Sequence, residues 1–455
     1  MIMRKKIGKL LIPILCLIPL LTGTIGYLNC GEEVTNSLYA SFALYFTNPV
    51  SDAYNGCIEF ARWTAPLVTA TAILCVLKTV WENLSLRLHL LGSRDSVAVY
   101  TDEDVEIAFD KKTKVIYPGD HFKGYAKSQI LWFSTDEKNL EFYAEHRDQL
   151  VKKEVYMGLH DLELGCMKEM KNATLFDINS SISKMLWNRI ALWNAGKEHI
   201  KVTVYGSGVL AQNILAGGLQ LNLFSGEQKV EYHVISGDSA FQIKHPAMPL
   251  MNADELHYYG EDDDRIWEVM GTSNLVIVAE KVSAQRLQTI AVRAENAPVY
   301  YYAPKEGELA EYLDFDNLIP FGRDREVLTD ENIRRQQLIR RAISLNEHYA
   351  EQYGGDPDWN NLSGFLKASN ISSADYGEVI ASMPPDTSEE MLVRLEHIRW
   401  CRFYYLNYWK YGAPEDGKRK DSAKRIHIDL VPFDCLTQVE QEKDLTAIRT
   451  WRNKA

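Results

Sequence analysis

The chain has 455 residues, too many for one compact core, and at about 150 residues per domain it suggests about three domains. A formal net charge of -12 with 25% charged residues indicates an ordinary soluble surface and argues against nucleic-acid binding through bulk positive charge. Seven cysteines occur without a CxxC pair, so neither a zinc site nor a disulfide framework is indicated. Cys30 and Cys57 share one connecting segment, where a disulfide is conceivable if that segment faces an oxidising compartment.

Two apolar runs near the N-terminus predict a transmembrane hairpin within residues 1–90. Residues 10–28 carry no charge, residues 63–84 carry charges only near their end, and each run is long enough to cross a bilayer. Basic residues flank the pair on its outer sides, whereas the connection is mainly acidic, so both termini are expected in the cytoplasm. We therefore expect a multi-pass protein of the cell (inner) membrane, with the lipid bilayer as a partner. An alternative is that residues 1–30 are a cleaved signal peptide, which leaves the soluble part cytoplasmic.

The connection between the two runs contains a further apolar segment. Asn36 to Phe46 has helical spacing and ends at Thr47, Asn48 and Pro49. One interpretation is a half-helix that re-enters the bilayer, an arrangement that resembles two-helix cation channels and makes Thr47 and Asn48 pore candidates. The segment lacks a TVGYG filter, so potassium selectivity does not follow. The other interpretation is an amphipathic helix at the membrane surface, and the sequence leaves both open.

Residues 91–196 predict a first α/β unit with a parallel sheet, because short β-branched runs alternate with helical patterns. The expected strands are 97–100, 115–117, 130–133, 155–157 and 174–176, and the clearest helices are 136–152 and 181–193. The turn after the first strand contains Asp102, Glu103 and Asp104. A phosphate needs bare backbone N–H groups there, and three carboxylates would repel it. We expect a degenerate Rossmann-like domain without a nucleotide.

Residues 197–328 predict a second Rossmann-like unit with a glycine turn. A strand at 202–205 leads directly into Gly206-Ser207-Gly208-Val209-Leu210-Ala211 and a helix that ends near Leu221, which is a GxGxxA motif in its expected context. Asp238, after a strand at 230–235, is a candidate for a ribose hydroxyl. Further strands are expected at 275–279, 299–302 and 318–321. The predicted nucleotide-binding residues are Gly206, Ser207, Gly208 and Asp238, and the candidate cofactor is NAD(H) or another adenine nucleotide. No catalytic residue stands out.

Two membrane helices followed by two Rossmann-like units resemble the regulator-of-potassium-conductance (RCK) family of ligand-gated channels and transport subunits. The resemblance extends over residues 1 to about 330 and rests on the order of the domains more than on the amino-acid sequence. It implies a homo-oligomer, a tetramer in that family, in which paired units form a gating ring below a pore and ligand binding is coupled to opening. The missing filter and the acidic first turn depart from the family pattern.

A charged amphipathic helix is expected at 329–355. The last domain (356–455) contains the most distinctive sequence motifs of the chain. They are EHxRW at Glu396–Trp400, WxYG at Trp409–Gly412 and HxDLVPxD at His427–Asp434. This succession resembles the ryanodine-receptor repeat (RyR) domain, a mainly α-helical module. Bacterial proteins with this repeat look like sensors of nucleotide-derived signals in antiviral defence, so the resemblance implies such a ligand.

The same residues have a direct physical interpretation. Aromatic rings stack on a base and cations hold a phosphate. The candidate ligand-binding residues are Arg399, Trp400, Trp409, Tyr411, Lys418, Lys420 and His427. The alternative is that the rings form the domain's own core and that the loop cations face water.

Three functions follow as hypotheses. The first is a ligand-gated membrane effector or ion channel whose cytoplasmic domains sense a nucleotide-derived signal. The second is a membrane-anchored NAD(P)-dependent enzyme that uses Gly206–Ala211, for which no acid or base can be nominated. The third is a non-conducting nucleotide sensor or scaffold anchored by the hairpin.

Overall fold

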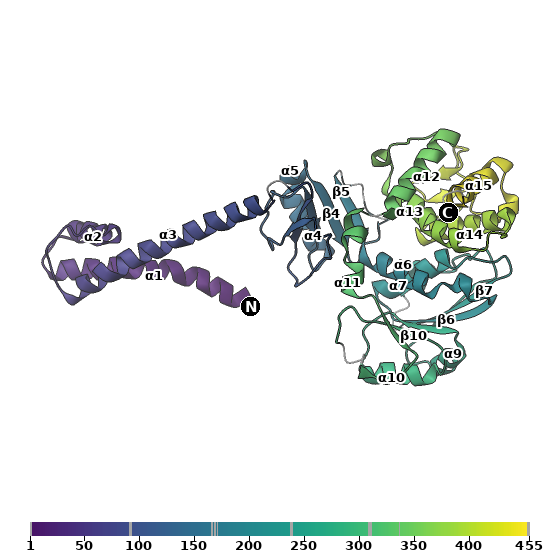
Figure 1. Ribbon diagram of the computed structural model, residues 1–455, viewed down its shortest axis with the longest axis horizontal. Coiled ribbons are helices and arrows are strands. Elements are labelled where there is room, and N and C mark those ends of the chain that lie inside the picture. Colours follow the sequence, from purple (N-terminus) through teal and green to yellow (C-terminus); the bar gives the residue numbers. More distant parts are fainter. Residues whose placement is uncertain are drawn as a thin grey trace. The chain divides into compact units, whose positions relative to one another are not determined.

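The computed structural model describes residues 2–90, 93–164, 167, 170, 172–236, 240–307, 312–335 and 337–452, without the side chains of residues 2–15, 79 and 335. The chain divides into two compact units, Met1–Ser93 and Arg94–Ala455. Each unit is described by itself below (Figure 1).

The N-terminal unit is a helical hairpin, and the segment that connects its two helices folds back against them. Helix α1 (Ile2–Asn29) packs on α3 (Gly56–Leu90), and α2 (Val34–Ala43) with the 3-10 turn η1 (Leu44–Phe46) connects them. The Tyr45 hydroxyl donates to the Cys16 carbonyl at 2.5 Å. Because Cys16 lies thirteen residues before the end of α1, the connecting segment returns about 20 Å along that helix.

Small residues allow these helices to approach closely. A Cβ on Gly23 would lie 2.9 Å from the Ser41 hydroxyl, and one on Gly26 would lie 2.7 Å from the Ile58 side chain. Close approach through small residues is the usual packing of helices in bilayers. The buried core of the unit is Tyr27, Ala40, Leu44, Ile58, Ala61 and Ala65.

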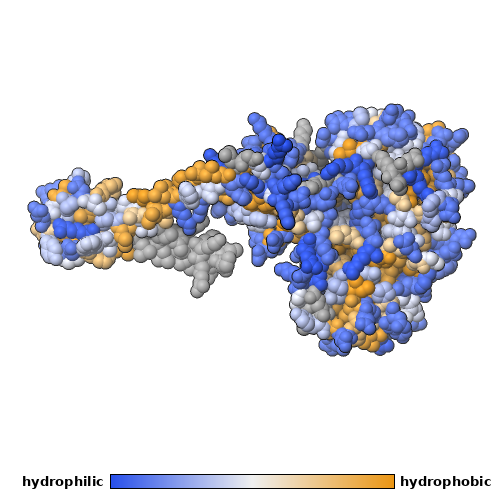
Figure 2. Space-filling view, viewed as in Figure 1, coloured by the Kyte–Doolittle hydropathy of each residue, from blue (hydrophilic) through white to orange (hydrophobic). Residues whose placement is uncertain are grey.

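Helix α3 presents apolar side chains outward along much of its length (Figure 2). Trp63, Leu67, Leu74 and Trp81 are each 65–76% exposed. Among the described residues α3 is the one helix long and apolar enough to cross a membrane, and α1 contributes the shorter apolar segment Cys16–Asn29. Two crossing runs were predicted, but the side chains before Cys16 lie outside the described part.

The first α/β unit contains a five-stranded parallel sheet in the order β2-β1-β3-β4-β5. Its strands are β1 (Ser96–Tyr100), β2 (Lys114–Ile116), β3 (Ser128–Leu131), β4 (Glu154–Leu159) and β5 (Ala173–Asp177). Helices α4 (Asp136–Glu145) and α5 (Arg147–Leu150) join β3 to β4, and α6 (Ile178–Ile190) and the 3-10 turn η3 (Leu192–Asn194) follow β5. All five strands were predicted, with boundaries within two residues.

The second α/β unit contains a six-stranded parallel sheet in the order β11-β10-β9-β6-β7-β8. Its strands are β6 (His199–Tyr205), β7 (Lys229–Ile235), β8 (Glu255–Tyr259), β9 (Leu275–Val278), β10 (Val299–Tyr302) and β11 (Leu318–Phe321). Its helices are α7 (Val209–Leu221), α8 (Ala240–Lys244), α9 (Ile266–Thr272), α10 (Ala284–Arg293) and α11 (Asp324–Val327). The sequence missed β8, a half-buried edge strand whose Glu255 and His257 interrupt the apolar pattern.

Numbered within the unit, this order is 6-5-4-1-2-3, the arrangement of dinucleotide-binding sheets. The predicted Rossmann-like, parallel α/β architecture is therefore confirmed. The direction of winding reverses between β6 and β9, where ligands bind in such sheets, outside the carboxyl ends of the strands.

The C-terminal segment is mainly helical. A π-helical turn (Glu331–Arg335) precedes α12 (Gln337–Tyr353), α13 (Gly364–Ser382), α14 (Glu389–Leu406) and α15 (Gln438–Arg452). A small sheet in the order β12-β14-β13 follows α14 and consists of Lys410–Tyr411, Ile426–His427 and Lys420–Asp421, and the 3-10 turns η6 and η7 span Trp359–Asn361 and Phe433–Cys435. These helices cover α6 and α7 (Figure 1) and share one hydrophobic core with them.

Candidate functional site

The glycine turn lies at the reversal point of the second sheet, but a carboxylate already occupies it. Gly206 has a φ of 136°, which favours glycine, and Gly208 is the N-cap of α7. The Ser207 N–H donates to the Glu280 carboxylate at 3.1 Å. A Cβ on Gly206 would lie 3.2 Å from the same carboxylate, so glycine here leaves room for Glu280. Asp238 lies outside the described residues.

Two separate spaces lie near this turn, a small cavity behind it and an open hollow beside it. The cavity behind the turn has a volume of about 10 Å³, which is about the space of one water molecule. An open hollow of about 470 Å³ lies at the ends of β6 and β9, lined by Tyr205, Glu261, Asp262, Val282, Ser283 and Arg286. Arg286 is the cation among the described residues that line it, and its guanidinium lies 5.3 Å from the centre of the Tyr205 ring.

In the first α/β unit, two carboxylates at the carboxyl edge of the sheet accept hydrogen bonds from backbone N–H groups of the same unit. Asp136 accepts the backbone N–H groups of His160, Asp161 and Leu162 at 2.7–2.8 Å. Asp102, from the acidic turn, accepts the Ser134 N–H at 2.8 Å. These backbone N–H groups after β3 and β4 are therefore engaged within the chain.

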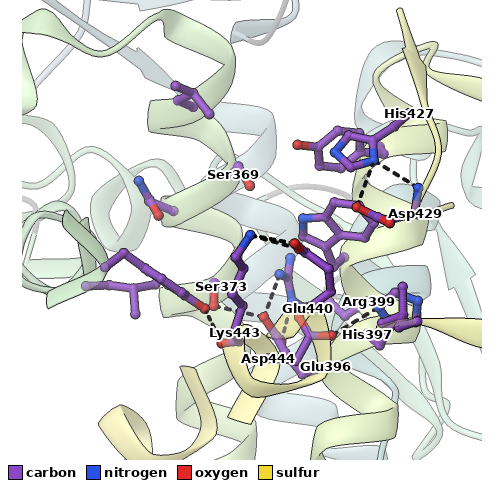
Figure 3. A pocket seen from close by; sticks show the side chains of 17 residues that line it. Ser369, Ser373, Glu396, His397, Arg399, His427, Asp429, Glu440, Lys443 and Asp444 are labelled. Atoms are coloured by element: carbon purple, nitrogen blue, oxygen red, sulfur yellow. Dashed lines mark hydrogen bonds and ion pairs between the residues drawn. The ribbon is translucent and has the colours of Figure 1, made fainter. Parts of the chain in front are cut away.

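A cavity of about 230 Å³ lies inside the C-terminal segment, between α13, α14, α15 and the small sheet (Figure 3). It is smaller than most small-molecule sites, which span about 300–1,000 Å³. The polar and aromatic groups that line it are Tyr349, Ser369, Asn370, Ser373, Glu396, His397, Arg399, Trp400, Tyr404, His427, Asp429, Glu440, Lys443 and Asp444.

One wall of this cavity is aromatic. The Trp400 ring lies 4.3 Å from the Tyr404 ring and 5.1 Å from the His427 ring, centre to centre. The His427 Nδ1 accepts the Asp429 N–H at 3.1 Å, so the ring is neutral with its proton on Nε2. Burial, with the nearby Lys420 and Arg419 charges, lowers the pKa of His427 to about 4. His427 is therefore uncharged at neutral pH, and the rings stand at angles to one another, 41° between Trp400 and Tyr404 and 84° between Trp400 and His427.

The floor carries a buried ion pair. Arg399 is 1% exposed and binds Glu396 through two hydrogen bonds of 2.7 and 2.8 Å. Its third nitrogen donates to the Ser372 hydroxyl at 2.6 Å, and Glu396 accepts from Ser373 at 3.1 Å. A buried arginine paired in this way needs no ligand to balance its charge.

His397 forms the second buried pair of the floor. Its Nδ1 lies 3.0 Å from the Asp444 carboxylate, and its Nε2 lies 2.8 Å from the Val431 carbonyl. Both neighbours accept hydrogen bonds, so the doubly protonated ring fits. Burial alone lowers the pKa of His397, but hydrogen bonds with Asp444 and Cys401 and their charges outweigh it and raise this pKa to about 11.

A Cys–His–Asp chain of contacts lies in the floor, formed by Cys401, His397 and Asp444. It resembles a catalytic triad in geometry but lacks a reactive thiol. The Cys401 sulfur lies 3.5 Å from His397 Nε2, but the thiol is fully buried. Burial raises the pKa of Cys401, and a reactive cysteine needs the opposite shift together with access. We assign the three residues a structural role.

Charged residues alternate at the rim. Lys443 donates to Glu440 at 2.8 and 2.9 Å, and Arg419 pairs with Glu440 at 3.3 Å and with Asp429. Lys420 pairs with His427 across the small sheet. Lys420 itself is exposed to solvent.

The structure brings together only part of the predicted ligand set. Arg399, Trp400 and His427 line the cavity, and Lys420 lies near its rim. Trp409 does not line it but packs in the core against Phe365 and Tyr404. Tyr411 is 59% exposed, and Lys418 pairs with Asp416 on the surface.

Sequence reasoning missed the contributions of α13 and α15. Ser369, Asn370 and Ser373 are spaced as one helix face, as are Glu440, Lys443 and Asp444. That spacing is visible in the sequence, but it is equally typical of a solvated helix face. Only the packing of α13 and α15 around α14 shows that both faces point into one cavity.

The cavity floor is connected to the second α/β unit. The Ser372 hydroxyl, which accepts from Arg399, donates to Gln220 on α7 at 2.6 Å. Arg402, fully buried, binds Asp254 at 2.8 Å and donates to the Leu219 carbonyl. The C-terminal helices and α7 are thus joined by buried polar contacts as well as by apolar packing.

Comparison with known proteins gives little. No protein-family model matches the chain, and no curated protein matches it. Among solved structures, a crystal structure of Mycobacterium tuberculosis shikimate dehydrogenase is similar over 47% of this chain and 81% of that one, at 10% identity and a TM-score of 0.28. A likeness at this level carries no functional argument.

Proposed function

We propose that the chain is a ligand-gated membrane effector. In this proposal the C-terminal cavity binds a small nucleotide-type ligand, the hairpin crosses the cell membrane with both termini in the cytoplasm, and ligand binding favours a conducting state of an assembly of identical chains. The resemblance to the RyR repeat and to the RCK arrangement, together with a role in antiviral defence, belongs to the same proposal.

The aromatic wall of the cavity is the observation that carries the proposal. The uncharged rings of Trp400, Tyr404 and His427 line the cavity beside the polar side chains of Ser369 and Asn370. A nucleobase stacks on such a wall and forms hydrogen bonds with such groups. Lys443 at the rim can meet a phosphate in exchange for its pairing with Glu440, whereas Arg399, the cation expected from the sequence, is held in the floor by Glu396.

The floor supplies a route for coupling. A ligand that shifts Arg399 also shifts Ser372, and Ser372 is bound to Gln220 on α7. Coupling requires that the ligand favour one arrangement of these contacts energetically over another. The short chain of hydrogen bonds provides two adjoining elements whose arrangement the ligand can bias.

The hairpin has features expected of a membrane element. Trp63 and Trp81 are exposed on α3 and lie eighteen residues apart, about 27 Å along the helix. This matches a hydrocarbon core of about 30 Å with an aromatic residue at each interface. The returning segment ends at Thr47, which has a φ of 57°, and Asn48, and these two exposed residues remain the pore candidates.

Thermal unfolding of the full chain in detergent, with a panel of nucleotides and matching nucleosides, tests binding. A ligand at one hundred times its Kd should add about 2.7 kcal/mol to the free energy of unfolding. Trp400→Ala should weaken binding about tenfold or more, because base stacking contributes about 1–3 kcal/mol. Tyr411→Ala is the matched control and should leave binding unchanged.

A second pair of variants separates the rim from the surface. Lys443→Ala should weaken binding of a nucleotide but not of its nucleoside, and Lys418→Ala should affect neither. Equal effects of Trp400→Ala and Tyr411→Ala would contradict the assignment of the cavity. No stabilisation by any nucleotide would contradict the ligand class and favour the scaffold hypothesis.

The enzyme hypothesis has less support. It needs a dinucleotide at the glycine turn, and there the Ser207 N–H is bound to Glu280. Turnover of a small substrate with NAD(P) by the wild-type chain would restore this hypothesis.

A further inference from the structure

Glu280 is placed where the glycine turn of a Rossmann-like unit presents its N–H groups to a phosphate. The residue follows β9, and the turn follows β6, the strand paired with β9. The carboxyl ends of these two strands define the reversal point of the sheet. Seventy-three positions separate Ser207 from Glu280, yet the sheet places one N–H and one carboxylate oxygen 3.1 Å apart.

The turn accommodates this carboxylate in three ways. The Ser207 N–H points at it, and the missing side chain of Gly206 leaves the space that it fills. Gly208, the N-cap of α7, makes no side-chain capping bond, so the first turn of α7 has no cap of its own. A negative group at a helix N-terminus is favourable, and the Glu280 carboxylate supplies one.

We propose that Glu280 is a built-in substitute for a nucleotide phosphate, which closes the glycine turn of the second unit to dinucleotides and so determines its specificity. A pyrophosphate at the turn would need the same N–H group and would bring negative charge against the Glu280 carboxylate. The turn is then not a degraded site. It is an intact glycine turn whose Ser207 N–H the chain itself occupies.

The surroundings allow an external ligand once Glu280 is removed. The space behind the turn holds about one water, but the hollow at the ends of β6 and β9 is open to solvent, so a ligand can approach this edge of the sheet from outside. Arg286 lines this hollow, within reach of the Tyr205 ring. Tyr205, which lines the hollow, directly precedes Gly206, so the hollow begins beside the turn whose N–H the loss of the Glu280 side chain would free.

Equilibrium dialysis of NAD+ against the full chain in detergent tests the proposal. Wild type should retain little NAD+, and Glu280→Ala should bind it on the order of tenfold more tightly or better, because one opposing charge is removed and one N–H is freed. Adding Gly206→Ala to Glu280→Ala should abolish the gain, since the second change refills the turn. Glu268→Ala, an acidic residue of α9 outside the turn, is the control and should behave as wild type.

A second measurement covers a variant that is less stable. Pyrophosphate should raise the Tm of Glu280→Ala by more than it raises the Tm of wild type, because only the variant has a vacant anion site at the glycine turn. Equal NAD+ binding by wild type and Glu280→Ala would overturn the proposal. So would a folded Glu280→Ala that neither binds NAD+ nor responds to pyrophosphate. Neither result bears on the C-terminal cavity, whose ligand is tested by Trp400→Ala.

Discussion

Both α/β units place one of their own carboxylates at the carboxyl edge of the sheet, but they hold it differently. In the first unit Asp136 is buried and accepts three backbone N–H groups. In the second unit Glu280 accepts one N–H beside an open hollow. The comparison teaches that the same edge of two parallel sheets can hold a carboxylate either by enclosing it among backbone N–H groups or by leaving it on a glycine turn beside an open hollow.

In the C-terminal segment the charges of two carboxylates are balanced by a third kind of partner. Asp444 and Glu396 are balanced by the side chains of His397 and Arg399, not by backbone N–H groups. Backbone groups do not titrate, whereas the His397 ring does. Three predictions use these differences, and the expected effects decrease from the first to the third.

The largest effect concerns pH. The folded-state pKa of His397, about 11, lies above its unfolded value of about 6.5. Its contribution to stability is therefore complete below pH 6.5 and is lost as pH rises towards 11. The loss approaches about 1.4 kcal/mol per pH unit, or about 3 kcal/mol between pH 7.5 and 9.5. Guanidinium unfolding of the full chain at several pH values should show this decline.

The matched variant is His397→Gln, which lacks the titrating group. Its stability should be lower at pH 7 and should decline less over the same pH range. A parallel decline in wild type and His397→Gln would show that the imidazolium does not balance Asp444.

The second effect concerns Asp136. Asp136→Ala leaves three partly buried N–H groups without their acceptor, and we expect a loss of about 2–3 kcal/mol in the free energy of unfolding. Asp120→Ala, whose side chain is 79% exposed, is the control and should change stability by less than about 0.5 kcal/mol. If Asp136→Ala were as mild as Asp120→Ala, the first unit would not be built around its carboxylate.

The smallest effect concerns the stability of Glu280→Ala. One hydrogen bond and a favourable charge at the start of α7 are lost, which together contribute about 0.5–1 kcal/mol at a partly exposed site. Hydrogen exchange should show faster opening of the first turn of α7 and no change in α4. A loss as large as that of Asp136→Ala would remove the distinction between the two units.

The sequence predicted the sheets well because buried parallel strands are short runs of β-branched and aromatic residues. Every strand of the first sheet was placed, whereas β8 was missed because an edge strand tolerates Glu255 and His257. The glycine turn was also found. Its occupant was not, because Glu280 meets Ser207 only through the pairing of β6 with β9.

The candidate cavity was predicted in part. Arg399 and Trp400 share a helix face whose spacing is fixed, so both were found, although the pairing of Arg399 with Glu396 makes it part of the floor. Trp409 was assigned to the ligand, but it belongs to the core, which was the alternative interpretation. Lys443 was missed because its helix reaches the cavity only through tertiary packing.

Ion flux from liposomes that contain the full chain tests the central claim most directly. The nucleotide that most raises the Tm of the wild-type chain is added outside and inside, and release of a trapped ion is followed for wild type, Trp400→Ala and Tyr411→Ala. The account predicts nucleotide-dependent release by wild type and Tyr411→Ala and a much weaker response by Trp400→Ala. Absence of release from wild type with the nucleotide bound, or equal release from Trp400→Ala, would contradict it.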